Sequence, residues 1–211
     1  ATSRTNSERG VTPFASPHRC PPTMSQRAII VLTAPSGAGK TTIAHRVLDT
    51  LAPLRFSVSA TTRAPRPEEV DGEDYHFLSV ETFQDRIADG ALLEYEEVYP
   101  DQFYGTLKRE IETSTPSAPV LLDIDVRGAE NVKQTYGDEA LVIFIAPPSF
   151  EVLKERLTGR GTEDNEAVQS RLKRAKMELM RADDFDAIVV NDDLDIAVEE
   201  TLRHINQFLA S

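Results

Sequence analysis

A glycine-rich segment near residue 35 has the residue types that bind phosphate groups. Residues 34–41 have the sequence Ala-Pro-Ser-Gly-Ala-Gly-Lys-Thr, which fits the pattern G-x-x-x-x-G-K-[ST] except that alanine replaces the first glycine. Gly37 and Gly39 can turn successive backbone N–H groups toward one anion. Lys40 can reach the β- and γ-phosphates of a nucleotide, and the Thr41 hydroxyl can bind Mg²⁺. The segment therefore predicts a site for nucleotide phosphates, a property that many classes of enzyme share.

Two pairs of charged side chains could act on a second phosphate group or on a cation. Arg63 and Arg66 lie on either side of a proline, an extended geometry that presents two guanidinium groups to one phosphate, although a solvated surface pair has the same pattern. Asp123 and Asp125 alternate onto one face at the end of an apolar run, where parallel sheets place ligands. Asp125 could orient a water bound to Mg²⁺, or it could cap a helix that begins near Gly128.

The residues on either side of the glycine-rich segment indicate the elements that position it. The continuous apolar run of residues 28–33 predicts a strand that is buried on both faces. In residues 40–51, Ile43 and Val47 belong to an apolar set with helical spacing, and Pro53 ends the pattern. A strand, a glycine loop and a helix in this order are the context in which such a loop binds phosphates, because the helix N-terminus adds positive potential.

The remaining apolar runs predict the class of fold. Residues 120–125, 140–146 and 187–191 have the composition of buried strands, and each run precedes a helical segment. Repeated strand and helix units imply a parallel sheet between helices. The predicted fold is therefore α/β, of the P-loop NTPase type, with three layers and a parallel central sheet.

Two segments interrupt this regular core. Residues 57–117 predict an inserted α+β subdomain, with short strands near 56–60, 75–78 and 92–98 and a helix near 80–89. Residues 158–185 are charged, helical and rich in arginine, as expected for a lid that closes over a site. The core is then formed by residues 24–56, 118–157 and 186–211.

Composition and charge exclude several functions. The 211 residues carry a formal net charge of −12, which argues against nucleic-acid binding because such binding needs a basic face. No apolar run approaches the ~20 residues that cross a bilayer, so no membrane partner is expected. The single cysteine, Cys20, cannot form an internal disulfide.

Residues 1–23 predict a disordered tail. Arg4, Arg9 and Arg19 stand against one acidic residue, Glu8, and the segment has no apolar periodicity. Such a composition is typical of an organellar transit peptide, and it also fits a mis-called start upstream of Met24. We favour the mis-called start, because the tail lacks a convincing amphipathic helix, and we expect a cytoplasmic protein.

Six motifs, in their order along the chain, resemble those of the guanylate kinase family of the bacterial type. The resemblance covers roughly residues 27–209 and implies ATP-dependent phosphorylation of GMP, giving ADP and GDP, with Mg²⁺ carried by ATP. The motifs are Ser57–Pro67 (SVSATTRAPRP), Val70–Phe77 (VDGEDYHF), Leu93–Glu94 with Phe103–Thr106 (LE and FYGT), Leu122–Gly128 (LDIDVRG), Gly159–Thr162 (GRGT) and Val190–Leu194 (VNDDL).

The resemblance implies how the guanine base is selected. Glu94 would accept hydrogen bonds from the N1–H and the exocyclic amino group of guanine, whereas adenine would leave the carboxylate unpaired. Ser59 would donate to the guanine carbonyl oxygen, and Thr106 would complete the pocket. Glu96 shares the strand face of Glu94 and Glu97 lies on the other face. Both are competitors for the role, although a solvated acidic edge also explains them.

The resemblance also implies which cations act on the transferred group. Arg156, Arg160 and Arg171 would neutralise charge on the moving γ-phosphoryl group after the lid closes. Arg174 and Arg181 match no motif and are expected on the helix surface.

The implied site residues are these. ATP would be bound by Ala34, Pro35, Ser36, Gly37, Ala38, Gly39, Lys40, Thr41, Thr42 and Asn191, and GMP by Ser59, Arg63, Arg66, Tyr75, Glu94, Tyr104, Thr106 and Asp123. The implied catalytic residues are Lys40, Arg63, Arg156, Arg160 and Arg171, and the metal would be held by Thr41 and, through water, by Asp125.

The sequence departs from the family pattern at three places. Ala34 replaces the first loop glycine, Glu68 replaces a common glycine, and residues 99–103 form a turn with one extra residue. These changes are expected to alter affinity and to leave activity intact.

Two other functions remain open: a kinase of phosphorylated ribose, which would not need the base readers, and a module that binds phosphorylated peptides without catalysis. A homo-oligomer is also open, because the helix expected over residues 195–209 could cover the sheet or contact another subunit.

Overall fold

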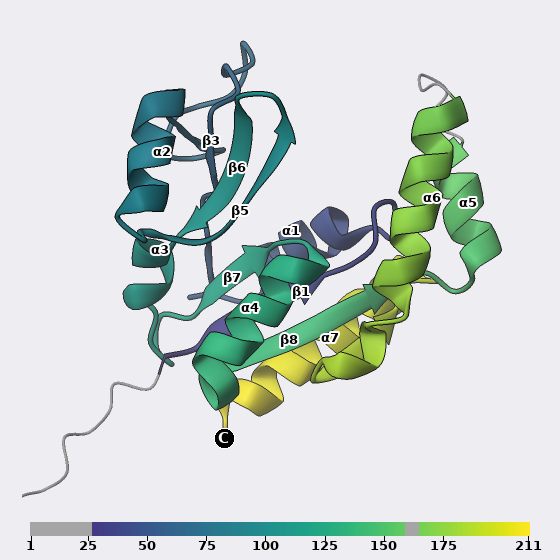
Figure 1. Ribbon diagram of the computed structural model, residues 1–211. Coiled ribbons are helices and arrows are strands. Elements are labelled where there is room, and N and C mark those ends of the chain that lie inside the picture. Colours follow the sequence, from purple (N-terminus) through teal and green to yellow (C-terminus); the bar gives the residue numbers. More distant parts are fainter. Residues whose placement is uncertain (1–26, 159–164) are drawn as a thin grey trace, which may run out of the picture.

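The computed structural model describes residues 27–158 and 165–211, and a five-stranded parallel sheet forms its centre (Figure 1). Strand β1 (Ile29–Thr33) lies in the middle of this sheet and is buried along its whole length, as its apolar β-branched sequence predicts. In spatial order the strands are β2 (Arg55–Phe56), β7 (Val120–Asp123), β1 (Ile29–Thr33), β8 (Ala140–Ala146) and β9 (Ala187–Val190).

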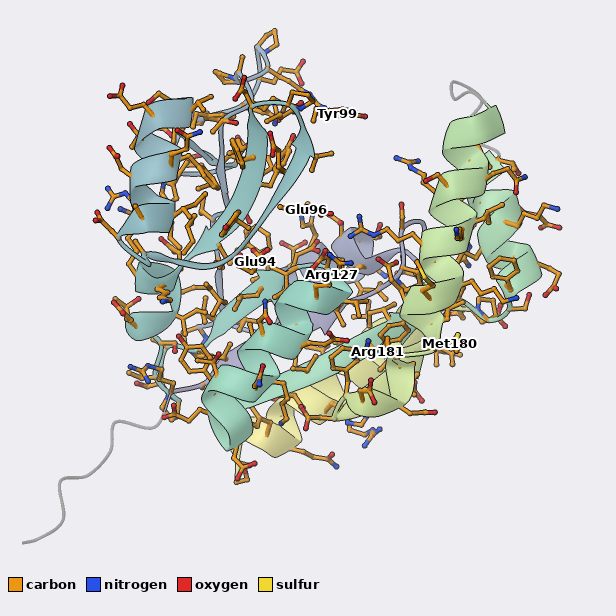
Figure 2. The ribbon with its side chains drawn as sticks, in the orientation of Figure 1. Glu94, Glu96, Tyr99, Arg127, Met180 and Arg181 are labelled. Atoms are coloured by element: carbon orange, nitrogen blue, oxygen red, sulfur yellow. The ribbon has the colours of Figure 1, made fainter. Side chains whose placement is uncertain are left out.

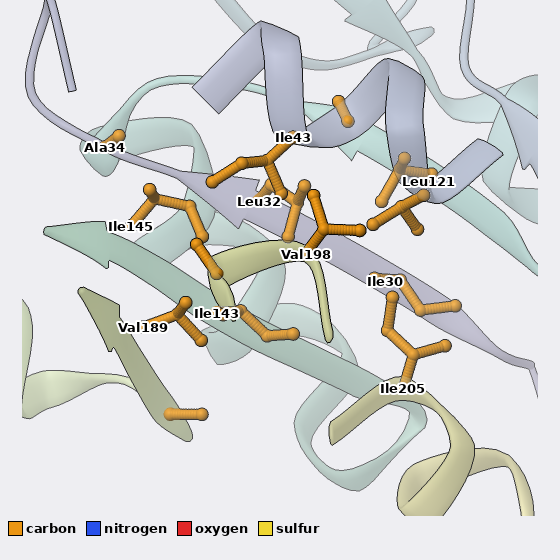
Figure 3. Packing of buried hydrophobic residues seen from close by; sticks show 14 of the residues in the cluster. Ile30, Leu32, Ala34, Ile43, Leu121, Ile143, Ile145, Val189, Val198 and Ile205 are labelled. Carbon is orange, nitrogen blue, oxygen red and sulfur yellow. The ribbon is translucent and has the colours of Figure 1, made fainter. Parts of the chain in front are cut away.

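Helices cover both faces of the sheet. Successive residues of a strand point to opposite faces, so Ile30 and Leu32 pack with helices α1 (Lys40–Thr50) and α7 (Leu194–Leu209) (Figure 3). Ile29 and Val31 pack on the other face, against α4 (Val126–Tyr136). This arrangement confirms the predicted α/β fold with three layers.

The C-terminal helix α7 packs on the sheet. Its Val198 and Ile205 belong to the same buried cluster as Ile30 and Ile143 (Figure 3). Of the two hypotheses for this helix, covering the sheet is therefore the one that the structure supports. Among the described residues, no helix is long and apolar enough to span a membrane.

A second, smaller sheet lies between β2 and β7 in the chain. Its pairing is mixed, because β3 runs parallel to β4 and antiparallel to β6. Phe83 packs against Phe103 beneath it, with ring centroids 5.3 Å apart. The strands, in spatial order, are β4 (His76–Phe77), β3 (Ala60–Thr61), β6 (Gln102–Leu107) and β5 (Leu92–Tyr99), and the helices are α2 (Val80–Ala88) and α3 (Lys108–Glu112).

One sequence prediction was wrong in this region. Residues 56–60 were expected to form one strand, but the chain pairs with β7 up to the backbone N–H of Ser57, which donates to Leu121 O, and then crosses to the smaller sheet. β2 and β3 are therefore separate two-residue strands in different sheets. Strand β6 was not expected at all.

Two further helices stand on the other side of α1 from the smaller sheet (Figure 1). α5 (Phe150–Thr158) and α6 (Asn165–Leu179) pack through a small apolar cluster that includes Leu153 and Leu172. Short 3₁₀ helices follow α4 at Gly137–Glu139 and α6 at Ala182–Asp184. The tail with Cys20, and the Gly159–Thr162 motif with Arg160, lie outside the described residues.

Candidate active site

The glycine-rich segment forms a tight loop between β1 and α1. Gly37 and Gly39 have φ values of 88° and 91°, a conformation that glycine adopts at little cost. A Cβ atom at Gly39 would lie 2.3 Å from Asn191 Nδ2, so the position also lacks space for a side chain. The Asn191 side chain donates to Ala38 O at 2.7 Å. Asn191, which follows the edge strand β9, therefore holds the loop that follows the central strand β1.

Alanine at the first loop position fits without strain. Among the described residues, Asp101, in the turn between β5 and β6, is the one non-glycine residue with a positive φ, so Ala34 does not have one. Ala34 is buried and needs no left-handed backbone. Alanine can therefore replace the first glycine of the pattern at this position without backbone strain.

Lys40 and Thr41 of the loop both contact Asp123, at the end of strand β7, which lies beside β1 in the sheet. Lys40 Nζ donates to Ile124 O at 2.9 Å and forms an ion pair with Asp123. Thr41 Oγ1 donates to Asp123 Oδ2 at 2.9 Å. Asp123 was expected to contact GMP. Its carboxylate binds the phosphate loop, and the contact with GMP stays a prediction.

Asp125, two residues further on, caps helix α4. One of its carboxylate oxygens accepts from the backbone N–H of Gly128 at 2.8 Å, as expected for an N-cap. The other oxygen accepts from Arg174 Nη2 at 2.9 Å. The capping hypothesis is confirmed, and a contact through water to a metal stays a prediction.

The loop lines a cavity of about 550 Å³ together with two arginines of α6. The lining includes residues 34–37 and 39–42, Arg171 and Arg174. Arg156 from α5 donates to the backbone oxygen of Asn191 at 3.1 Å. The structure thus brings Arg171 to the cavity at the loop, whereas Arg156 contacts the residue that holds the loop, and Arg160 lies outside the described residues.

On the acceptor side, Arg63 is held by an acid that the sequence analysis did not single out. Its Nη1 and Nη2 atoms donate to the two oxygens of Glu69, each at 2.8 Å, and its guanidinium lies 5.3 Å from the centre of the Tyr75 ring. The paired guanidinium lowers the pKa of Glu69 from 4.5 to about 2. The backbone N–H of Arg66 also donates to Glu69 at 2.8 Å, while the Arg66 side chain is exposed.

A second cavity, of about 430 Å³, joins the acceptor residues to the loop. Ser59, Tyr75, Thr41 and Asp123 all line it. The Tyr104 ring lies edge-on to Tyr75, with centroids 6.1 Å apart. Burial raises the pKa of the Tyr75 hydroxyl, so this group stays protonated at neutral pH and can donate to an anion.

Glu94 lies beside the start of α4. It accepts a hydrogen bond from Thr106 Oγ1 at 2.7 Å, and its Cγ atom would lie 3.1 Å from a Cβ atom at Gly128. Burial raises the pKa of Glu94, and the Thr106 hydrogen bond opposes this effect. The negative charge of Asp125 raises the pKa further.

Glu96, which lies near Glu94 on β5 (Figure 2), and Glu97 have other partners than Glu94. Glu96, two residues on, accepts from Arg174 at 3.2 Å. Glu97 accepts from the backbone N–H of Asp101 at 3.0 Å and stabilises the turn. Arg174 was expected on the helix surface. Its side chain is indeed half-exposed, but its ion pair with Glu96 was not expected.

Sequence analysis did not identify three other residues of the site. His45, Glu73 and Asp74 line the acceptor cavity beside Ser59. Nothing in their local sequence signals this position, except that Glu73 and Asp74 lie in a motif together with Tyr75. Arg181, by contrast, forms ion pairs typical of a helix surface, with Glu130 and Asp184.

The parallel sheet and the glycine loop after its central strand define a fold of the P-loop NTPase type. A family model described as guanylate kinase matches residues 26–210. A guanylate kinase from Salinibacter ruber is 66% identical over 188 residues, which are 89% of this chain and all of that protein. The chain therefore belongs to the guanylate kinase family.

More distant relatives agree with this assignment. A guanylate kinase from Chlorobium luteolum is 46% identical over 183 residues, covering 87% of this chain and 93% of that protein. The crystal structure of a guanylate kinase from Anaplasma phagocytophilum superimposes with a TM-score of 0.67 at 29% sequence identity. It covers 87% of this chain and 86% of that chain.

Proposed function

We propose that this protein transfers the γ-phosphoryl group of ATP to GMP, forming ADP and GDP. One observation carries the proposal: Thr41 of the phosphate loop lines both the cavity at the loop and the cavity of the acceptor residues. A donor and an acceptor bound in these cavities would meet at the loop. The names of the relatives support GMP as the acceptor.

In the reaction, the bond from the γ-phosphorus to its bridging oxygen breaks, and a bond to a phosphate oxygen of GMP forms. Such a transfer needs mainly alignment and neutralisation of charge. Lys40 would contact the donor phosphates. Arg156 and Arg171 would add positive charge from α5 and α6, and closing these helices over the cleft would exclude water.

Arg63 would bind the phosphate of GMP. Glu69 fixes its guanidinium in a bidentate pair, and a guanidinium has more N–H donors than this pair uses. Tyr75 and Tyr104 would donate to the same phosphate. Glu94, Ser59 and Thr106 would select guanine. The N–H groups of the base would donate to Glu94 and so favour its ionised form, against the effect of burial.

The residues at the loop fit Mg²⁺. Thr41 and Asp123 offer a hydroxyl and a carboxylate within 2.9 Å of each other, and Mg²⁺ prefers oxygen ligands. In the part of the chain that the structure describes, no cluster of three metal-binding side chains exists. Phosphates and water would therefore supply the other ligands, and the ion would neutralise phosphate charge when bound. A cytoplasmic location and a homo-oligomer stay predictions.

The test is an assay of ADP release with ATP and Mg²⁺, with GMP, AMP, UMP, CMP and ribose 1,5-bisphosphate in parallel. We expect turnover that is selective for GMP and that falls by on the order of 100-fold or more in Lys40→Ala. Lys176→Ala, which removes an exposed lysine of α6, serves as the control and should keep full activity.

Each other outcome points to a different function. Turnover with the sugar phosphate would support the assignment of the phosphate loop and contradict the assignment of Glu94, Ser59 and Thr106 as residues that select guanine. Binding of GMP without turnover of any acceptor would favour a binding module.

A further inference from the structure

Arg174 of α6 binds three carboxylates at once. Its Nη1 donates to Glu96 at 3.2 Å, its Nη2 to Asp125 at 2.9 Å, and its Nε to Glu178 at 2.8 Å. Each nitrogen of the guanidinium thus has its own acidic partner. Such charge-assisted bonds fix the plane of an arginine far better than one contact does.

The three partners come from three parts of the molecule. Glu96 lies on β5 of the smaller sheet and faces the space between that sheet and α6 (Figure 2). Asp125 caps α4 on the large sheet, and Glu178 lies one turn further along α6. Arg174 is therefore a point where the acceptor region, the central core and α6 are connected.

This point lies at the wall of the active site. Arg174 and Glu178 line the cavity at the phosphate loop, and with Glu96 they also line a neighbouring cavity of about 480 Å³ between α4 and α6. Three carboxylates without Arg174 would repel one another and the phosphates of a bound nucleotide. The cation thus makes a close approach of these elements favourable.

We propose that Arg174 is a positioning residue for phosphoryl transfer, which sets the approach of β5 to the phosphate loop by binding Glu96 and Asp125 together. This proposal rests on the proposed function. Transfer depends on alignment of donor and acceptor, and a displacement of about 1 Å can cost on the order of 100-fold in rate. Arg174 acts through the acceptor sheet, so its loss lowers kcat more than it raises KM for ATP.

The experiment is a double-mutant cycle in the full chain. Arg174→Gln should lower kcat about 10- to 30-fold, and Glu96→Gln, which leaves the other two partners in place, about 3- to 10-fold. The double variant should be no slower than Arg174→Gln alone, because both changes break one link. Arg174→Lys should rescue only part of the rate, since a single ammonium cannot match three carboxylates in one plane.

A control variant and a salt series separate this role from a structural one. Lys176→Gln removes the same charge from an exposed position on the same helix and should match the wild type. Raising KCl from about 0.1 to about 1 M shortens the Debye length from ~10 to ~3 Å. The kcat ratio between wild type and Glu96→Gln should therefore fall toward one, because this exposed pair is screened. Thermal melting of each variant verifies that it is folded.

The failure of each proposal has a distinct result. A wild type without GMP turnover contradicts the proposed function before any variant is compared. An active wild type with Glu96→Gln and Arg174→Gln both within twofold of Lys176→Gln overturns the role of Arg174. Additive losses in the double variant, or a deficit of Glu96→Gln that salt does not change, overturn the link between the two residues.

Discussion

The phosphate loop and the acceptor side of the cleft are built in different ways. The loop depends on backbone conformation, with two left-handed glycines after a fully buried strand. The acceptor side depends on pairs of side chains, such as Arg63 with Glu69 and Glu94 with Thr106, on a sheet that contains two-residue strands. Substitutions in the loop should therefore abolish function, whereas those on the acceptor side should change selectivity and leave the fold intact.

The largest effect is expected from Gly39→Ala. The new Cβ would lie 2.3 Å from Asn191 Nδ2 on a backbone with φ of 91°. Either the Asn191 amide leaves Ala38 O, which it now holds at 2.7 Å, or the loop itself moves, and both changes disturb its phosphate-binding shape. We expect kcat/KM for ATP to fall by on the order of 1,000-fold. Steady-state kinetics at varied ATP will measure it.

Gly72→Ala is the matched control for this change. Gly72 has a similar φ of 82° but nothing within 4 Å of the added atom. It should cost about 1–2 kcal/mol of stability and leave kcat/KM within about threefold. Equal losses of activity in both variants would mean that backbone strain, and not the shape of the loop, explains the result.

A smaller and more selective effect is expected from Glu94→Gln. The amide replaces one acceptor by a donor that faces the guanine N–H groups, so kcat/KM for GMP should fall on the order of 100-fold while that for AMP changes little. Glu97→Gln, on the other face of β5, is the control. Unchanged discrimination between GMP and AMP in Glu94→Gln would contradict the assignment of Glu94 as the base reader.

The smallest effect is expected from Glu69→Gln and concerns stability. The folded-state pKa of Glu69, about 2, lies below its ordinary value of 4.5. Its ion pair with Arg63 therefore stabilises the fold above about pH 4.5, and this contribution is lost as the pH falls toward 2. Wild type should melt slightly above Glu69→Gln at pH 6, with a difference that shrinks below pH 4.5. Glu68→Gln, which removes the exposed neighbouring carboxyl, is the control. A constant difference for Glu69→Gln would exclude the ion pair as its cause.

The regular core could be predicted from the sequence because its signals are local. β1 and β8 are continuous apolar runs, and the glycine loop between β1 and α1 has a recognisable spacing. The strand β6 was missed, because residues 102–107 mix polar, aromatic and glycine residues without a clear period. The strand expected over residues 56–60 was wrong, since which sheet a short strand joins depends on distant partners.

The site residues that could be predicted from the sequence also had local signals, whereas those that were missed depend on contacts between distant residues. Capping of α4 by Asp125 was among the hypotheses, because a cap is a local pattern. The contacts of Arg174 were not predicted, since Glu96 and Asp125 lie 78 and 49 residues away in the sequence. Glu69, six residues after Arg63, has no local signal that separates it from a solvated acid.

The place where the smaller sheet joins the larger one has a consequence for evolution and design. The chain departs and returns side by side, because the backbone N–H groups of Arg55 and Ser57 donate to Pro119 O and Leu121 O, each at 2.9 Å. A segment whose two ends meet can be exchanged with little disturbance of its host. A different acceptor unit could therefore be grafted between β2 and β7, giving one ATP-binding scaffold a new substrate without redesign of its phosphate loop.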